Sequence, residues 1–370
     1  SKTDRSKTKR ILQVWKATNG WQTEFKTECK SPATAVAFSS DGQLIALADS
    51  DLNQGKTVKF CKTNSGLSAT MEISQKQNLF MTFSQNNKFF AIANDDNTVQ
   101  VWRVPDDSQF ASDRKASIKV SSNPVWQFPL ESSVEAIALS PDGLRLVIAG
   151  ADNTATLWDV ATKQFLAQWN HESKINAVTF SDRGNFIATA SDDNKAKIFK
   201  KDGEEHCSSP RKLLQHEGGV IAIAFSHNEK YLATGSLNGQ GRVWSVESCQ
   251  NVVLLNHTEK INTEKINAVT FNSDDRFVAT ASDDKTAKVW DISSGREVVR
   301  LDHEEPVNSV VFKPQDDRQI ATVSSDKTAK IWFWKLEDLR DQACKHINFD
   351  LTQKEWQRYM GDENNQPICP

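Results

Sequence analysis

The sequence repeats one segment of about 25 residues seven times, and this repetition limits the possible folds more than any other feature. Residues 175–199 and residues 266–290 are identical at 15 of 25 aligned positions. Looser copies occupy residues 134–158, 220–244 and 307–332, and two more degraded copies occupy residues 33–61 and 78–102. A fixed period of a few tens of residues is typical of stacked supersecondary units.

Each copy contains the pattern of three short strands, and a fourth strand follows it. Residues 268–271 alternate apolar and polar side chains, as a strand with one buried face does. Turn-forming residues separate this segment from strand-like segments at 277–282, 286–290 and 297–301. A sheet of four antiparallel strands is too small to bury its own faces, whereas seven such sheets around an axis bury one another. The sequence therefore predicts an all-β fold, a seven-bladed β-propeller with four-stranded antiparallel blades.

The spacing of the copies agrees with seven blades. The predicted third strands end at intervals of 41, 56, 41, 45, 46 and 42 residues, at Cys61, Trp102, Trp158, Phe199, Trp244, Trp290 and Trp332. The longest interval contains an additional polar segment at 105–123, which we expect to protrude as a loop. Residues 11–15 resemble a third strand and residues 21–28 a fourth. We expect residues 21–28 to pair with residues 327–334 and close the ring, while residues 11–15 leave eight blades as the alternative.

Two Trp-Asp pairs, Trp158-Asp159 and Trp290-Asp291, and the histidines before the later copies resemble the WD-repeat propeller family. In that family a His before the first strand, a Ser or Thr in the second, an Asp in the next turn and the Trp of the third form a buried hydrogen-bonded tetrad. The resemblance implies two complete tetrads, which are His257, Ser282, Asp284, Trp290 and His303, Ser324, Asp326, Trp332. Two further sets are incomplete, because Phe199 replaces the Trp and Asn238 replaces the Asp.

The two ends of the chain differ from the repeats. We assign residues 1–9 to a polar linker, residues 10–335 to the propeller and residues 336–370 to a helical C-terminal tail, whose first part has a helical apolar stripe. The tail resembles the ends of bacterial, especially cyanobacterial, multidomain WD-repeat proteins. Several of those proteins resemble STAND-type signalling ATPases, so the resemblance implies a sensor propeller with covalently linked domains upstream.

Composition restricts the class of partner and the compartment. The chain has 45 basic and 48 acidic residues, a net charge of −3, which argues against a nucleic-acid binder. It has neither a signal-peptide-like start nor an apolar run of the roughly 20 residues that span a bilayer, so we expect no membrane partner. The six cysteines have no metal-ligand spacing and favour thiols in a reducing compartment, although Cys344 and Cys369 could pair. We therefore expect a cytoplasmic protein.

No motif indicates catalysis, a cofactor or a metal. Gly55-Lys56-Thr57 lacks both the earlier glycine and the following helix of a phosphate-binding loop. The repeated histidines lie one blade apart and therefore cannot converge on one ion. In the Asp-Asp pairs the second Asp belongs to the turn and the first should be solvated, which is a poor setting for a general acid. The sequence predicts a protein that is not an enzyme.

We predict a non-catalytic protein-interaction or sensor module that binds a protein or peptide on one face of the propeller. A purely structural scaffold or spacer is the alternative, and a propeller-type hydrolase is less favoured. The loops before the first and third strands of each blade should emerge on the same rim. Polar side chains without an expected structural role recur on this rim, namely Asp95, Glu135, Lys174, Asn176, Asp192, Lys265, Asn267, Asp283 and Asn308.

Overall fold

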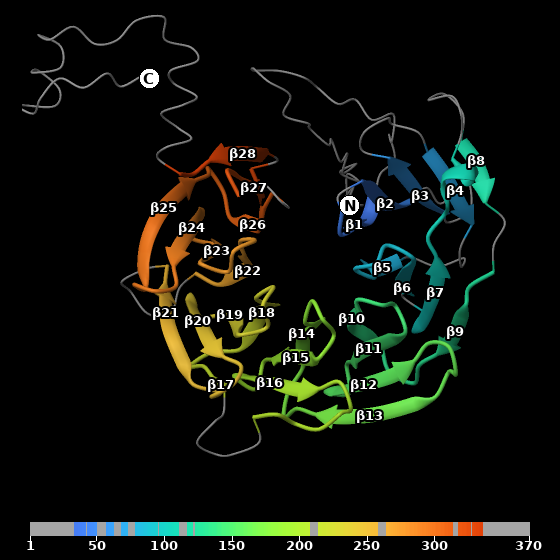
Figure 1. The fold of residues 1–370 in the computed structure, drawn as a ribbon, viewed down its shortest axis with the longest axis horizontal. Helices are drawn as coiled ribbons and strands as arrows, with labels where there is room; N and C mark the ends of the chain where they lie inside the picture. The colour runs from blue at the N-terminus through green and yellow to red at the C-terminus, as the bar shows by residue number, and fades with distance from the viewer. Residues whose placement is uncertain are drawn as a thin grey trace, which may run out of the picture.

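The repeats fold into seven sheets arranged around a central axis in the computed structural model (Figure 1). The structure describes residues 33–335 except 42, 50–56, 63–67, 73–77, 95, 111–116, 121–122, 208–213, 258–263, 314–316 and 327. The predicted all-β propeller is confirmed, and each predicted repeat is one blade. The linker at 1–9 and the helical tail at 336–370 lie outside the described residues.

The first three blades contain the first thirteen strands and one short helix. Blade 1 consists of β1 (Ala33–Phe38), β2 (Leu44–Asp49), β3 (Thr57–Lys62), β4 (Ser68–Glu72) and β8 (Ser117–Val120). Blade 2 consists of β5 (Asn78–Phe83), β6 (Phe89–Asn94), β7 (Thr98–Arg103) and β9 (Trp126–Pro129), with the 3-10 helix η1 (Asp107–Gln109) after β7. Blade 3 consists of β10 (Val134–Leu139), β11 (Arg145–Gly150), β12 (Thr154–Asp159) and β13 (Phe165–Asn170).

The remaining four blades follow the closest copies of the repeat. Blade 4 consists of β14 (Ile175–Phe180), β15 (Phe186–Ser191), β16 (Lys195–Lys200) and β17 (Leu214–Gln215). Blade 5 consists of β18 (Val220–Phe225), β19 (Tyr231–Ser236), β20 (Gln240–Ser245) and β21 (Asn251–Asn256). Blade 6 consists of β22 (Ile266–Phe271), β23 (Phe277–Ser282), β24 (Thr286–Asp291) and β25 (Arg296–Asp302). Blade 7 has three described strands, β26 (Val307–Phe312), β27 (Gln319–Ser324) and β28 (Ala329–Phe333).

The first strand of every blade has a β-bulge at its second residue. The register with the second strand shifts between the first and third residues of the strand in all seven blades. A bulged residue has no ladder partner, and the bulge changes the direction of its side chain. The seven bulge residues are Thr34, Leu79, Glu135, Asn176, Ile221, Asn267 and Asn308.

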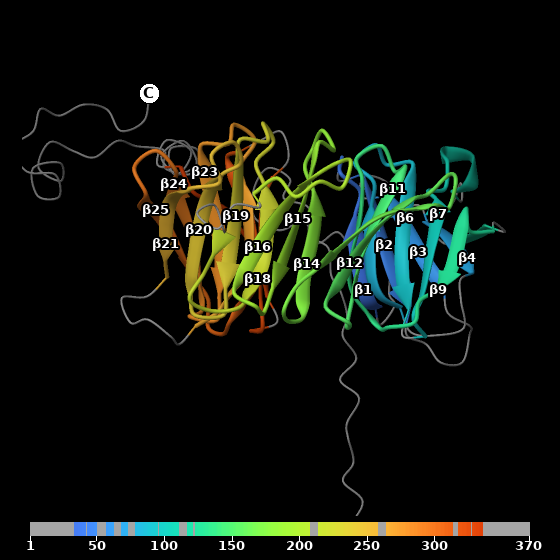
Figure 2. The ribbon, with the colours of Figure 1, turned by 90° about the horizontal axis from the view of Figure 1, so that it is seen from below.

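The hydrophobic core lies between neighbouring blades. Between blades 5 and 6, Val243 and Leu255 share one buried cluster with Ile266 and Trp290. At Gly235 the blades approach so closely that an added Cβ would lie 2.6 Å from Ile266 Cγ2. Seen from the side, the strands run between two faces of a short cylinder (Figure 2). Each blade therefore depends on its neighbours for burial.

The segment at 105–123, predicted to protrude as a loop, lies between β7 and β9 of blade 2, and its strand β8 extends blade 1. This strand pairs in parallel with β4 at the edge of blade 1. Before β8, Lys62 Nζ lies 2.6 Å from Asp107 Oδ1 and 4.8 Å from the centre of the Phe110 ring, which is buried. The additional residues in the long interval therefore connect blade 2 to blade 1.

The inner strands contact one another in one series from β1 through β5, β10, β14, β18 and β22 to β26. In Figure 1, blade 7 and blade 1 are the two ends of this series, and their ribbons lie on either side of a gap in the ring. The predicted closure by residues 21–28 lies outside the described residues and stays a prediction. No helix in the described part of the chain has the length and apolar character needed to cross a membrane.

Candidate partner-binding face

In blade 6, a hydrogen-bond network centred on one buried histidine holds the start of the first strand against the second and third strands. His257 is buried and its Nδ1 lies 3.0 Å from Asp284 Oδ2. Its Nε2 is hydrogen-bonded to the hydroxyl of Thr280, which also accepts a 2.9 Å hydrogen bond from Trp290 Nε1. The imidazole thus connects the loop before β22, the strand β23, the next turn and the strand β24.

The hydroxyl in this network belongs to a threonine, which corrects the predicted serine. In blade 7, Thr322 accepts from Trp332 Nε1 at 2.8 Å and lies 2.7 Å from His303 Nε2. The His303 Nδ1 atom lies 3.0 Å from Asp326 Oδ2. The two predicted serines have another role, because Ser282 and Ser324 donate to carbonyl groups of the preceding loop and accept from the turn.

The aspartates of these networks are strongly stabilised as carboxylates. Burial raises the pKa of Asp193, but hydrogen bonds from His171 and from backbone N–H groups outweigh it and lower the pKa to about 2. The pKa values of Asp284 and Asp326 are lowered in the same way. A carboxylate with a depressed pKa contributes stability that is lost as the pH falls through its folded value.

Blade 5 carries a defective version of the network. His216 Nε2 lies 2.7 Å from Thr234 Oγ1, but Asn238 replaces the aspartate. The Oδ1 atom of Asn238 accepts from the backbone of Gln240, whereas its Nδ2 and His216 Nδ1 have no hydrogen-bond partner among the described residues. Burial and the nearby Arg242 cation lower the pKa of His216 to about 3.

Changing Asn238 to Asp should therefore stabilise the protein by about 1–2 kcal/mol at neutral pH, because a carboxylate oxygen would pair with His216 Nδ1. In the natural sequence, stability should fall as the pH drops from about 6.5 towards about 3, since only the unfolded chain binds a proton at His216. The stability of the variant should fall less over this pH range, because the new carboxylate favours the protonated form of His216. Denaturant unfolding at pH 7 and pH 5 measures both effects. Equal stabilities of the two proteins at both pH values would refute this assignment.

Several of the predicted rim residues contact one another in separate groups at the starts of the first strands. Asn176 Nδ2 donates to Asp192 Oδ1 at 2.6 Å and to the carbonyl of Val220 in blade 5 at 3.0 Å. Asn267 repeats this geometry, with bonds of 2.7 Å to Asp283 Oδ1 and 2.9 Å to the carbonyl of Val307. These asparagines therefore link neighbouring blades, which is a structural role that the sequence did not indicate.

Two lysines lie beside these asparagines. Lys174 Nζ lies 2.7 Å from Glu135 Oε2 of blade 3, and the lysine side chain is 49% exposed. Lys265 Nζ lies 3.7 Å from Asp283 Oδ2 and is 44% exposed. Blade 7 has a neutral version, in which Asn308 Nδ2 donates to Ser325 Oγ at 3.0 Å. Asp95 lies outside the described residues.

A cavity of about 460 Å³ opens on the face of the ring opposite the predicted rim residues. The sequence did not indicate this cavity. It lies between the first strands of blades 1 to 4 and includes the turns that follow them, whereas the rim residues stand where first strands begin. Asp182 lines it, and burial raises the pKa of this carboxyl group. The cavity lining also includes small residues of the first strands, such as Ala37, Ala138 and Thr179.

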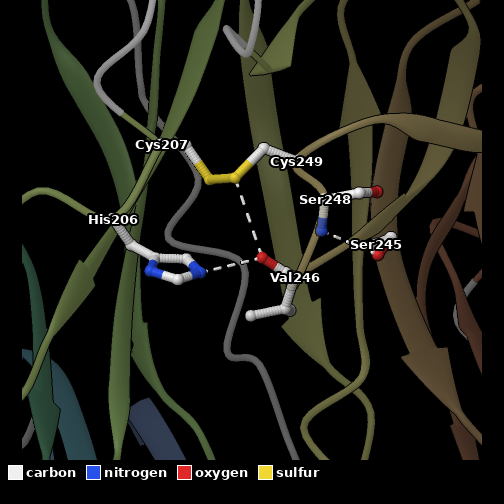
Figure 3. The surroundings of a disulfide bond; sticks show 6 residues. All are labelled: His206, Cys207, Ser245, Val246, Ser248 and Cys249. Carbon is white, nitrogen blue, oxygen red and sulfur yellow. Dashed lines mark hydrogen bonds between the residues drawn. A yellow bond between two sulfur atoms is a disulfide. The ribbon is translucent and has the colours of Figure 1, made fainter.

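One group of three potential metal ligands comes together among the described residues, at His206, Cys207 and Cys249. The two sulfur atoms are bonded to each other, and His206 Nε2 lies 2.9 Å from the carbonyl oxygen of Val246 (Figure 3). The disulfide joins the segment after β16 in blade 4 to the turn between β20 and β21 in blade 5. Cys61 is also disulfide-bonded, so the expectation of free thiols is wrong for the described cysteines.

Known proteins resemble this chain both in sequence and in fold. The family model "WD domain, G-beta repeat" matches residues 207–245, 250–291 and 295–332, and the model "Anaphase-promoting complex subunit 4 WD40 domain" matches residues 81–183. The crystal structure of the computationally designed Ika8 protein aligns with a TM-score of 0.64 at 23% identity, covering 81% of this chain and 83% of that chain. This last likeness concerns the fold alone.

Curated relatives match over part of their length. Autophagy-related protein 16 of Arabidopsis thaliana is 27% identical over 55% of this chain and 46% of its own length. Pre-mRNA-processing factor 19 homolog 2 of the same plant is 25% identical over 52% of this chain and 35% of its own length. Guanine nucleotide-binding protein subunit beta-1 of Nicotiana tabacum is 28% identical over 37% of this chain and 38% of its own length. The chain thus spans less than half of each of these relatives.

The radial sheets and their histidine-centred hydrogen-bond networks define a β-propeller. Together with the repeats matched by the family models, they show that this protein is a WD-repeat β-propeller. Proteins of this class are typically non-enzymatic scaffolds and interaction modules, and the protein is a member of that class.

Proposed function

We propose that the propeller binds a protein or peptide partner on the rim where the first strands begin, through the repeated Lys-Asn-Asp sets of blades 4 and 6. The first set is Lys174, Asn176 and Asp192, and the second is Lys265, Asn267 and Asp283. The near balance of 45 basic and 48 acidic residues supports a protein partner over nucleic acid or an anionic membrane.

The observation that carries this proposal is the fixed orientation of the two asparagine side chains. Each Nδ2 group makes two hydrogen bonds, to the turn of its own blade and to a carbonyl group of the next blade. No described residue donates to Oδ1 of Asn176 or Asn267. Two acceptors are thus held in place beside exposed lysines, at little cost in side-chain entropy on binding.

This chemistry favours a polar loop or an extended peptide. The asparagine oxygens can accept from backbone N–H groups, the lysines can pair with acidic side chains, and the aspartates can pair with basic ones. The described residues of the two Lys-Asn-Asp sets are polar, so we expect binding through a few hydrogen bonds and ion pairs. Such contacts weaken as salt increases.

The test is a quantitative pull-down from cell extract with the whole chain as bait. Changing Lys174, Asn176, Asn267 and Asp283 together to Ala should reduce recovery of a specific partner at least tenfold. A second variant reverses only the charges of Lys174 and Lys265 to Glu and leaves the asparagine bridges intact. The control changes Lys230 and Gln250, which are exposed residues away from this rim, to Ala.

The outcomes separate the candidate functions. Loss in both rim variants but not in the control supports the rim. Unchanged recovery in both rim variants places the contact elsewhere, and the cavity containing Asp182 is then the next region to change. If no specific partner is recovered with any bait, the protein is better explained as a structural spacer than as an interaction module.

We extend the proposal to a sensor propeller of a larger cytoplasmic signalling protein with covalently linked domains upstream. It rests on the resemblance of residues 336–370 to the tails of bacterial multidomain proteins. A reading frame with a nucleotide-binding module before this segment would support it, and a frame without further domains would refute it.

A further inference from the structure

Two cysteines and one histidine come together at the boundary between blades 4 and 5. His206 and Cys207 follow β16, and Cys249 lies in the turn between β20 and β21. One ligand atom from each of these side chains lies within 4.8 Å of the other two. His206 Nε2 and Cys249 Sγ also face the same carbonyl oxygen, that of Val246, at 2.9 and 3.7 Å (Figure 3). The three side chains therefore converge from two blades on one place.

Reduction of the disulfide would convert this group into a set of zinc ligands. A dithiol gives up two electrons and two protons and becomes a disulfide, while the bond between Cys207 and Cys249 breaks and leaves two thiols. The Cα atoms of the two cysteines are 5.9 Å apart. From this spacing, rotation of the side chains can bring both sulfur atoms to the roughly 2.3 Å, and the imidazole nitrogen to the roughly 2.0 Å, of zinc coordination.

The surroundings of the sulfur atoms favour zinc over harder divalent cations. Cys207 and Cys249 are each 3% exposed and belong to one buried cluster with Leu214 and Trp244. Two thiolates alone would be costly in such apolar surroundings. A Zn²⁺ ion bound by two thiolates and a neutral imidazole has no net charge, which removes most of this cost. Magnesium and calcium prefer oxygen ligands and do not fit these donors.

We propose that the reduced protein binds one Zn²⁺ ion through His206, Cys207 and Cys249, with water as the fourth ligand. Each thiol releases its proton when the ion binds. The ion then holds the segment after β16 against the turn of blade 5, as the disulfide does in the oxidised protein. His206 is only partly buried, which gives the ion a route from solvent. This inference is independent of the proposed rim function.

The test titrates Zn²⁺ into the whole chain against a chromogenic chelator. The chain is first reduced with a phosphine, which offers no thiol to the metal. The natural chain should bind one more equivalent of zinc than the double variant Cys207→Ser, Cys249→Ser. His206→Ala should weaken binding by roughly tenfold or more, since losing a ligand costs at least as much as losing its hydrogen-bond partner. The matched control, His227→Ala, changes a partly exposed histidine of blade 5 outside this group and should bind zinc unchanged.

Cobalt distinguishes this site from zinc bound elsewhere on the chain. Co²⁺ should give a thiolate-to-metal charge-transfer band in the natural chain and in His227→Ala, but not in the double variant. Zinc should also raise the melting temperature of the reduced natural chain by several degrees and leave that of the reduced double variant unchanged. Equal zinc stoichiometry and equal cobalt spectra in the natural chain and the double variant would overturn the proposal. Zinc affinity unaffected by His206→Ala would overturn the three-residue site.

Discussion

Replacing Cys207 and Cys249 together by Ser should lower the free energy of unfolding by about 4 kcal/mol. The cysteines are 42 residues apart, and restricting the unfolded chain with a loop of that length is worth roughly this amount. Blade 4 has particular need of the cross-link, because its outer strand β17 has only 2 residues. Denaturant unfolding of both proteins without reductant measures the difference.

A dithiol reductant supplies the control. The natural protein should lose most of this stability in reductant, and the double variant should lose less, since only the disulfide at Cys61 is then open to reduction among the described cysteines. Hydrogen exchange should also increase at residues 201–207 in the variant. Identical unfolding midpoints for the natural protein and the variant without reductant would show that the bond does not form in solution.

Changing Asp326 to Ala should lower the free energy of unfolding by about 3 kcal/mol, near the upper end for loss of a buried polar partner. Its Oδ2 lies 3.0 Å from His303 Nδ1, and its Oδ1 accepts bonds of 2.8 and 2.6 Å from the backbone and hydroxyl of Thr328. The alanine variant would leave a buried imidazole nitrogen without its partner and loosen the turn before β28.

The control for this variant is Asp283→Ala. Asp283 lies in the equivalent turn of blade 6, between β23 and β24. Asp283 Oδ1 accepts one hydrogen bond from Asn267, and its side chain is 30% exposed. We expect a loss of about 1 kcal/mol for this variant. Thermal unfolding of both variants at pH 7 would contradict the assignment if Asp283→Ala were the less stable protein.

The repeat was sufficient to predict the blades and most members of each histidine-centred hydrogen-bond network, because strand alternation and turn residues are local properties. It was insufficient to choose between Thr280 and Ser282, which are two residues apart and therefore lie on the same side of β23. The register decides the choice. Val278 is opposite Trp290, so Thr280 is within reach of the indole and Ser282 is at the far end of the strand.

Contacts between blades could not be predicted from one repeat. The link that Asn176 makes between blades depends on the carbonyl of Val220. This group is 44 residues away in the sequence and reaches the amide only when the blades are packed. The pairing of Cys207 with Cys249 and the return of β8 to blade 1 depend on the same packing. The rim residues were recognisable as a set because they repeat, but their partners were not.

The bulge at the second residue of each first strand has a consequence for how such a ring can diversify. Because the bulged residue lacks a ladder partner, its identity is not dictated by strand pairing, and the seven blades carry Thr, Leu, Glu, Asn, Ile, Asn and Asn there. If the rim binds a partner as proposed, substitution at these positions would change what the ring recognises, except that Asn176 and Asn267 also link neighbouring blades. Specificity could then change in one blade while the buried strands of the others stay the same.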